Sequence, residues 1–272
     1  MIAEIGGRRF DWGSRTYVMG IVNVTPDSFS GDGVGPDLEM AVDQGMRMVR
    51  EGADMLDVGG ESTRPGHVPV SADEEIARTE SVVRRLARDS GVPVSIDTYK
   101  LQVAEVAVAA GATILNDVWG LTRSPAIADL ATANGSALVL MHNQDGTEYA
   151  GDLMEEVKRF LSVAAARAMA AGVPKERVIV DPGIGFGKTA EQSITVIARL
   201  GELRSLGLPL LVGLSRKRFI NFVSSSKPSE RLGGSIAGNV LAVLAGADIV
   251  RVHDVAETAQ ALRTMDAIVK AR

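Results

Sequence analysis

The stretch that decides the fold of this chain is residues 94–117, VSIDTYKLQVAEVAVAAGATILND. Two short runs rich in β-branched residues, 94–97 and 113–117, flank an alanine-rich segment that has the periodicity of a helix. A strand, a helix and a second strand in this order form the repeating unit of a parallel sheet. The stretch therefore predicts one βαβ unit.

The same alternation extends over the whole chain. Eight β-branched runs precede helical segments, at residues 17–24, 55–58, 94–97, 113–117, 137–141, 178–181, 210–214 and 248–252. Eight units favour closure into a (β/α)₈ TIM barrel, and an open doubly wound sheet is the alternative. Because no segment resembles a linker, residues 1–272 are expected to form one domain, with the residues before the first strand closing the bottom of the barrel.

Composition excludes several classes of protein. The net charge of −5 is spread along the chain, so neither nucleic acid nor an anionic membrane is an expected partner. The absence of cysteine excludes disulfides, thiolate metal sites and thiol nucleophiles. No apolar run approaches the roughly 18 residues of a membrane span, and the first residues, MIAEIGGRRFDWG, lack the apolar core of a signal peptide. A cytoplasmic protein is expected.

Local signals mark where some helices begin and end. Ser71 with Glu74, and Asp254 with Glu257, have the spacing of a capping box at a helix start. Gly172 is expected just beyond the end of a helix, since glycine adopts the left-handed conformation that often follows the last turn.

Polar side chains follow almost every predicted strand. They are Asn23, Asp57, Asp97, Asn116, Asp117, His142, Asp181, Ser215, Lys217, Arg251 and His253. In a barrel these positions all lie at the C-terminal mouth, where this fold carries its active sites. A helix cap is the commoner role for one such residue alone, but so many together predict a substrate site.

The last strand suggests what the site binds. Arg251 and His253 lie two residues apart, so their side chains share one face of the strand. The bidentate fork of an arginine beside an imidazole donor suits a polyanion such as pyrophosphate.

Two further strand ends suggest a second part of the substrate. Ser215 and Lys217 share a face by the same rule, so Arg216 is expected to face away and to be structural. Asp181 and Asn116 supply a carboxylate and an amide at the barrel mouth. These groups would match a flat heterocycle that carries adjacent N–H donors.

Residues 183–189, GIGFGKT, are similar to a phosphate-binding P-loop, but the first glycine lies one residue too close to Gly187-Lys188-Thr189. We interpret the segment as a loop after a strand, in which Phe186 forms a wall of the substrate pocket and Lys188 is solvated. His67 and His142 lack the spacing of a transition-metal site, whereas an oxygen-ligated cation remains open. The long connections at 25–38 and 59–71 are candidate lids.

The motifs MGIVNVTPDSFSGDG, DVGGESTRPG, SIDTYK, ILNDVWG, VDPGIGFGKT, LVGLSRKRF and IVRVHDVAET occur in this order and resemble those of the dihydropteroate synthase family. The resemblance spans nearly the whole chain. It implies a transferase that condenses 6-hydroxymethyl-7,8-dihydropterin diphosphate with p-aminobenzoate by an S_N1-like route. The products would be pyrophosphate and 7,8-dihydropteroate, a precursor of folate. It also implies Mg²⁺ as cofactor and a homodimer formed through outer helices.

The resemblance also implies roles for individual residues. The pterin would be held by Asp97, Asn116, Asp181 and Lys217. The pyrophosphate would be bound by Asn23, Thr63, Arg64, Arg251 and His253, with Asn23 also a ligand of Mg²⁺. The p-aminobenzoate pocket would consist of Phe29, Thr63, Pro65, Phe186, Ser215 and Lys217. Catalysis would depend on Asp97, Lys217, Arg251 and His253, with Asp97 foremost in stabilising the positive charge that develops on the pterin.

Some positions depart from the family pattern. Trp119 stands where a small residue is usual, Ser193 replaces an asparagine, and the segment after Met141 differs. Two alternatives remain, a pterin-binding methyltransferase domain and a non-catalytic pterin-binding paralogue. The Ser-Arg-Lys and Arg-x-His motifs favour the synthase over the methyltransferase.

Overall fold

The barrel is complete in a computed structural model that describes residues 1–24, 34–61 and 69–271. Eight parallel strands form its sheet, in the order β8-β7-β6-β5-β4-β3-β10-β9. Their bounds are β3 (Tyr17–Asn23), β4 (Met55–Gly59), β5 (Val94–Asp97), β6 (Ile114–Asp117), β7 (Ala137–Met141), β8 (Val178–Asp181), β9 (Leu211–Val212) and β10 (Ile249–Val252). A parallel bridge between Val180 and Leu210 joins the two ends of this order. The predicted barrel is confirmed, and the open sheet is excluded.

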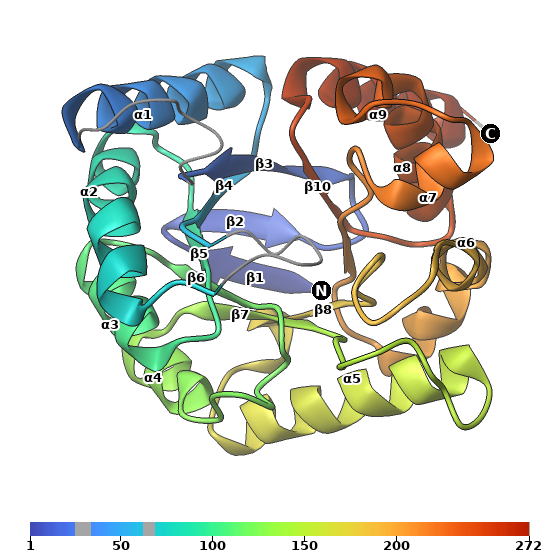
Figure 1. The fold of residues 1–272 in the computed structure, drawn as a ribbon, viewed down its shortest axis with the longest axis horizontal. Coiled ribbons are helices and arrows are strands. Elements are labelled where there is room, and N and C mark those ends of the chain that lie inside the picture. Colours follow the sequence, from blue (N-terminus) through green and yellow to red (C-terminus); the bar gives the residue numbers. More distant parts are fainter. Residues whose placement is uncertain (25–33, 62–68, 272) are drawn as a thin grey trace.

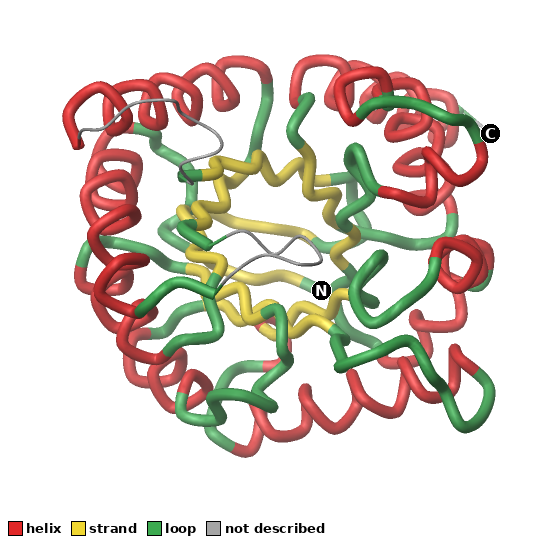
Figure 2. The backbone as a smooth tube through the Cα atoms, in the orientation of Figure 1, coloured by secondary structure: helices red, strands yellow, loops and turns green. Residues whose placement is uncertain are grey.

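Helices surround the strands on the outside (Figures 1 and 2). They are α1 (Val34–Glu51), α2 (Ala72–Asp89), α3 (Leu101–Ala109), α4 (Ile127–Asn134), α5 (Leu153–Ala170), α6 (Ala190–Ala198), α7 (Arg218–Val223), α8 (Leu232–Leu244) and α9 (Val255–Lys270). Short 3₁₀ turns lie at Lys175–Arg177, Leu200–Leu206 and Pro228–Glu230. Among the described residues, no helix is both long enough and apolar enough to cross a membrane.

An antiparallel hairpin of β1 (Ile2–Ile5) and β2 (Arg8–Asp11) lies across the barrel (Figure 1). Phe10 from the hairpin stacks on Trp12 and packs against Tyr17, with ring centroids 5.3 and 5.1 Å away. These rings join an apolar cluster whose strand residues lie near the N-terminal ends of the strands, among them Met55 and Ile249. The hairpin therefore closes the bottom of the barrel, as predicted.

Strand alternation divides the barrel into an outer and an inner layer. Outward side chains such as Val250 and Val252 pack against the helices in the large core cluster. Inward side chains are apolar near the bottom, where the hairpin covers them, and polar near the top. The barrel thus presents its polar inward positions at the C-terminal mouth.

The helix signals are confirmed only in part. Ser71 caps α2 by accepting from the backbone N–H of Glu74, but the Glu74 carboxylate binds Arg78 instead of returning to the cap. Gly172 lies just beyond α5 with a left-handed φ of 104°. Asp254 occupies the N-cap position of α9 without a capping bond, because its carboxylate pairs with Arg216. The box predicted at Asp254 is therefore wrong.

Candidate active site

A buried polar cluster fills the centre of the mouth. Arg251, from β10, donates from Nε to Asp57 Oδ2 at 2.6 Å and from a terminal nitrogen to Asp97 Oδ2 at 2.8 Å. Asn116, from β6, donates from Nδ2 to the same Asp57 oxygen at 3.0 Å. Side chains from three strands, β4, β6 and β10, therefore meet at one carboxylate, and Arg251 links it to Asp97 on β5. Asp57, fully buried at the centre, is a site residue for which the sequence offered only its position at a strand end.

The cluster holds more acceptor capacity than its own donors use. Within the described part of the chain, Asp57 Oδ1 and Asp97 Oδ1 are buried and have no hydrogen-bond partner. Such orphaned acceptors are uncommon in folded proteins and point to a ligand that supplies donors or positive charge.

The charges in the cluster perturb one another. Burial raises the pKa of Asp97 to about 7, with Arg251 opposing the shift and Asp57 adding to it. Burial by itself would lower the pKa of Arg251, but the carboxylates of Asp57 and Asp97 raise it above its ordinary value. The guanidinium therefore stays charged while Asp97 titrates near neutral pH.

A second group of polar residues lies beside this cluster. Asp181, at the end of β8, accepts from the backbone N–H of Gly183 at 2.7 Å through Oδ1, and burial raises its pKa. Lys217, which follows β9, donates from Nζ to the carbonyl oxygen of Ile184 and lies 4.7 Å from the ring centre of Phe186. Burial lowers the pKa of Lys217 to about 8, against the opposing charge of Asp181.

His253 and Ser215 lie together at the neighbouring strand ends. The Nδ1 atom of His253 is 3.0 Å from the hydroxyl oxygen of Ser215, and the backbone N–H of His253 donates to the same oxygen at 3.3 Å. Arg216 points elsewhere, as expected, because its guanidinium pairs with Asp254. The guanidinium of Arg251, on the same strand as His253, is bound to Asp57 and Asp97.

The prediction that Lys188 is solvated is wrong. Its side chain is buried, with 7% of the residue exposed, and Nζ lies 2.8 Å from His142 Nδ1. The sequence could not show this, because a lysine after a glycine-rich turn is usually free to reach water.

The residues at the top of β3 and β4 fit the magnesium that the resemblance implies. The Asn23 side chain is half-buried. Its Oδ1 and the Oδ2 of Asp97 both lie next to Gly59, since a Cβ placed on Gly59 would be 4.0 Å and 3.8 Å from these two oxygens. Among described residues, no three His, Cys, Asp or Glu side chains gather as a metal cage. One amide oxygen fits a cation that takes its remaining ligands from phosphate and water, which is how proteins commonly bind Mg²⁺.

Four of the expected site residues, Phe29, Thr63, Arg64 and Pro65, lie outside the described residues, as does His67. Most residues of the two candidate lids, 25–38 and 59–71, also lie outside the described residues.

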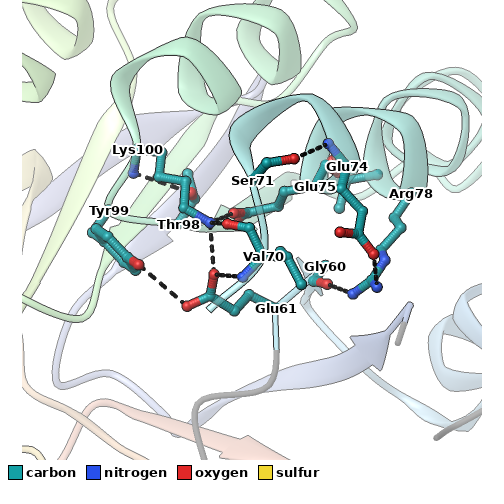
Figure 3. A network of polar contacts seen from close by, with 11 residues as sticks. Gly60, Glu61, Val70, Ser71, Glu74, Glu75, Arg78, Thr98, Tyr99 and Lys100 are labelled. Atoms are coloured by element: carbon teal, nitrogen blue, oxygen red, sulfur yellow. Dashed lines mark hydrogen bonds and ion pairs between the residues drawn. The ribbon is translucent and has the colours of Figure 1, made fainter. Parts of the chain in front are cut away.

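A polar network joins residues that precede position 62 to residues that follow position 68 (Figure 3). Lys100 Nζ bonds to a carboxylate oxygen of Glu61 and one of Glu75, each at 2.6 Å, and to the carbonyl oxygen of Val70 at 2.8 Å. The backbone N–H of Val70 also donates to Glu61 at 3.1 Å. The network fixes Glu61 and Val70 beside the start of α3, and no local pattern in the sequence predicts that these two residues are connected.

The barrel mouth holds buried acids, an amide and two cations, together with buried acceptors that have no partner. These features are those of a pterin-binding barrel. The chain matches the family model described as pterin binding enzyme over residues 19–253. A dihydropteroate synthase of Clostridium beijerinckii is 45% identical over 98% of this chain and 99% of its own length. The chain belongs to the dihydropteroate synthase family, and it is a transferase.

Solved structures agree with this assignment. A dihydropteroate synthase of Clostridium difficile, crystallised in the presence of pteroic acid, has a TM-score of 0.93 and 50% identity, covering 95% of this chain and 98% of its own. A Xanthomonas albilineans dihydropteroate synthase with 4-aminobenzoic acid has a TM-score of 0.93 and 43% identity, with 98% of both chains covered. The methyltransferase alternative has no support from these relatives.

Proposed function

We propose that this chain condenses 6-hydroxymethyl-7,8-dihydropterin diphosphate with p-aminobenzoate and releases 7,8-dihydropteroate and pyrophosphate. The observation that carries the proposal is the cluster of Asp57, Asp97, Asn116 and Arg251, which leaves two buried acceptors open at the barrel mouth. The ligands named for the relatives, pteroic acid and 4-aminobenzoic acid, belong to the same chemistry and support it.

The pterin ring is placed by groups that are already oriented. The amide nitrogen of Asn116 is committed to Asp57, which leaves its Oδ1 to accept from a ring N–H. Asp181 uses Oδ1 for the turn that follows it, so Oδ2 is available for the 2-amino group. Asp97 and Lys217 complete the proposed site with a carboxylate and an ammonium group that interact electrostatically.

The diphosphate of the substrate is proposed to bind at Arg251 and His253, whose guanidinium and imidazole can donate to its oxygens. Arg251 already contacts Asp97 at 2.8 Å, and its positive charge favours the ionised carboxylate. Arg251 would therefore link the leaving group to the carboxylate that stabilises the reaction.

The reaction then follows an S_N1-like course. The bond between the pterin methylene carbon and the diphosphate oxygen breaks, and its electron pair leaves with pyrophosphate. The ionised Asp97 stabilises the positive charge that remains on the pterin, and a fixed charge in a dry site is effective because it need not reorganise. The aniline nitrogen forms the new C–N bond with its lone pair and loses a proton to solvent. When bound through Asn23, Mg²⁺ supplies charge neutralisation for the departing diphosphate.

The p-aminobenzoate pocket is proposed at Phe186, Lys217 and Ser215 among the described residues. Phe186 and Lys217 already contact each other, so ring and cation form one wall. The hydroxyl of Ser215 is engaged with His253 and would exchange that contact for the substrate carboxylate. Phe29, Thr63 and Pro65 remain predictions for the rest of the pocket.

A homodimer is proposed through the outer helices α7, α8 and α9. Apolar side chains are exposed on each of these helices, namely Phe222, Val223, Leu241, Leu244, Ile268 and Val269. A second copy would cover them, whereas a monomer would leave them in water. The single domain over residues 1–272 and the cytoplasmic location stay predictions.

Turnover is the test that separates the candidate functions. Purified protein is incubated with the pterin diphosphate, ¹⁴C-labelled p-aminobenzoate and Mg²⁺, and labelled dihydropteroate and pyrophosphate are measured together. Equal amounts of both products are expected. A non-catalytic paralogue would bind the pterin without either product, and pyrophosphate without dihydropteroate would mean that the cation is lost to water.

A further inference from the structure

The glycine-rich turn after β8, residues 183–187, is packed tightly against the end of β7 and the residues that follow it. Gly183, Gly185 and Gly187 have positive φ values of 66°, 81° and 55°. A Cβ on Gly183 would lie 2.0 Å from the carbonyl oxygen of His142, so the turn approaches the end of β7 more closely than any other residue type permits. The similarity to a P-loop is limited to the sequence. In a P-loop, backbone N–H groups and the lysine bind phosphate, whereas here two carbonyl oxygens of the turn bind the lysine.

Lys188 holds the turn from its buried side. Its Nζ lies 2.8 Å from His142 Nδ1, 3.1 Å from the carbonyl oxygen of Gly183 and 3.0 Å from that of Phe186. An ammonium group has three N–H donors, and here each meets one acceptor. Within the described residues Lys188 forms no ion pair with a carboxylate. It serves the backbone of the turn and not a charge partner.

The ring of His142 and the hydroxyl of Tyr149 agree with this role. Burial lowers the pKa of His142 to about 3, so its ring is neutral and Nδ1 can accept. Burial also lowers the pKa of Lys188 to about 7, with the charge of Asp181 opposing and that of Lys217 adding to the shift. The hydroxyl of Tyr149 donates to the carbonyl oxygen of Gly187 at 2.8 Å and fixes the end of the turn.

The opposite side of the same turn holds two proposed substrate residues. The backbone N–H of Gly183 donates to Asp181, and the carbonyl oxygen of Ile184 accepts from Lys217. The ring of Phe186 lies over the Lys217 ammonium group. A displacement of the turn would therefore move the partners of Lys217 and Asp181 together.

We propose that Lys188 is a positioning residue for the condensation, which locks residues 183–187 so that Ile184 and Phe186 hold the Lys217 ammonium group in the substrate site. The inference rests on the proposed function and deepens it. Without Lys188, three acceptors lose their donor, two of them buried and the carbonyl oxygen of Phe186 half-buried, and the turn loses the bonds on its buried side. An error of about 1 Å in a positioned group can cost a hundredfold in rate.

A double-mutant cycle tests the proposal. The rate constant kcat/KM for p-aminobenzoate is measured for the wild type, Lys188→Met, Lys217→Met and the double variant, using labelled substrate for sensitivity. Lys188→Met is expected to lower kcat/KM by roughly 10- to 100-fold in the wild type and by less than about threefold when Lys217 is already absent, because residues that act through one another are not additive. The same factor in both backgrounds, or no loss in the first, would overturn the proposal.

Controls separate positioning from a general loss of stability. Leu86→Ala removes a fully buried side chain of α2, and should lower Tm while leaving kcat/KM of the folded fraction unchanged. Lys158→Met makes the same substitution at a half-buried lysine of α5 that pairs with Glu155, and should leave kcat/KM unchanged. If Lys188→Met does not fold, Lys188→Gln, which keeps two N–H donors, takes its place in the cycle with a smaller expected loss.

The outcome is independent of the test of function. A wild type without dihydropteroate formation would refute the proposed function itself. A wild type that turns over, with Lys188→Met equally active, would refute only the role of Lys188.

Discussion

Asp57 is the residue whose removal tests the electrostatics of the site most directly. The variant Asp57→Asn keeps the size and shape of the side chain and removes its charge. In the structure that carboxylate accepts from Arg251 at 2.6 Å and from Asn116 at 3.0 Å. The substitution therefore weakens the placement of two proposed substrate residues without opening a cavity.

The expected loss of activity follows from these contacts. A hydrogen bond to a charged group contributes about 1.5–3 kcal/mol, and each ~1.4 kcal/mol is a factor of ten in rate. We expect kcat/KM for the pterin diphosphate to fall by roughly 10- to 100-fold. Stability should change little, because the ionised cluster of Asp57, Asp97 and Arg251 passes from a net charge of −1 to zero, which reduces buried repulsion. A shift in Tm of less than about 3 °C corresponds to under ~1 kcal/mol in a protein of this size.

The pH profile supplies the sharper measurement. The charge of Asp57 raises the pKa of Asp97, so its removal lowers that pKa from about 7. Activity that requires ionised Asp97 rises with pH through this pKa, and the acidic limb of log(kcat/KM) should move to lower pH in Asp57→Asn. Ionisation of the substrate is common to both enzymes and cancels in the comparison. A limb that stays in place or moves upward, or a kcat/KM within about twofold of the wild type, would refute the reasoning.

Other substitutions have equally definite outcomes. Asp97→Asn should lower the single-turnover rate by at least about 100-fold with pterin affinity much less affected, measured by rapid quench and calorimetry, because its charge acts on the transition state. Gly183→Ala should cost more than about 3 kcal/mol by urea unfolding, since its Cβ would strike the His142 carbonyl oxygen, whereas Gly7→Ala, with a similar φ of 72° and open space, should cost ~1–2 kcal/mol. Asn23→Ala should raise the Mg²⁺ concentration for half-maximal rate roughly tenfold, with activity abolished by EDTA in both proteins.

Much of the fold could be predicted because the signals are local. Alternating β-branched and helical segments define eight strands within two residues of their observed ends, and the two-residue period places Arg251 inside the barrel and Val250 outside. The strand β9 is shorter than expected, Leu211–Val212 against 210–214, since the chain leaves the sheet at Gly213. Both the barrel and its polar mouth can thus be predicted from the order of residue types along the chain.

The sequence by itself therefore determined the barrel, its closed bottom and the set of polar residues at its mouth, because each depends on spacings of a few residues. The tertiary structure decided which of those residues meet. Arg251 binds Asp57, which lies 194 positions away in the sequence, and Lys188 contacts His142, which lies 46 positions away. Partners at such separations are fixed by how the barrel closes and by which buried donors find acceptors, and no local pattern contains that information.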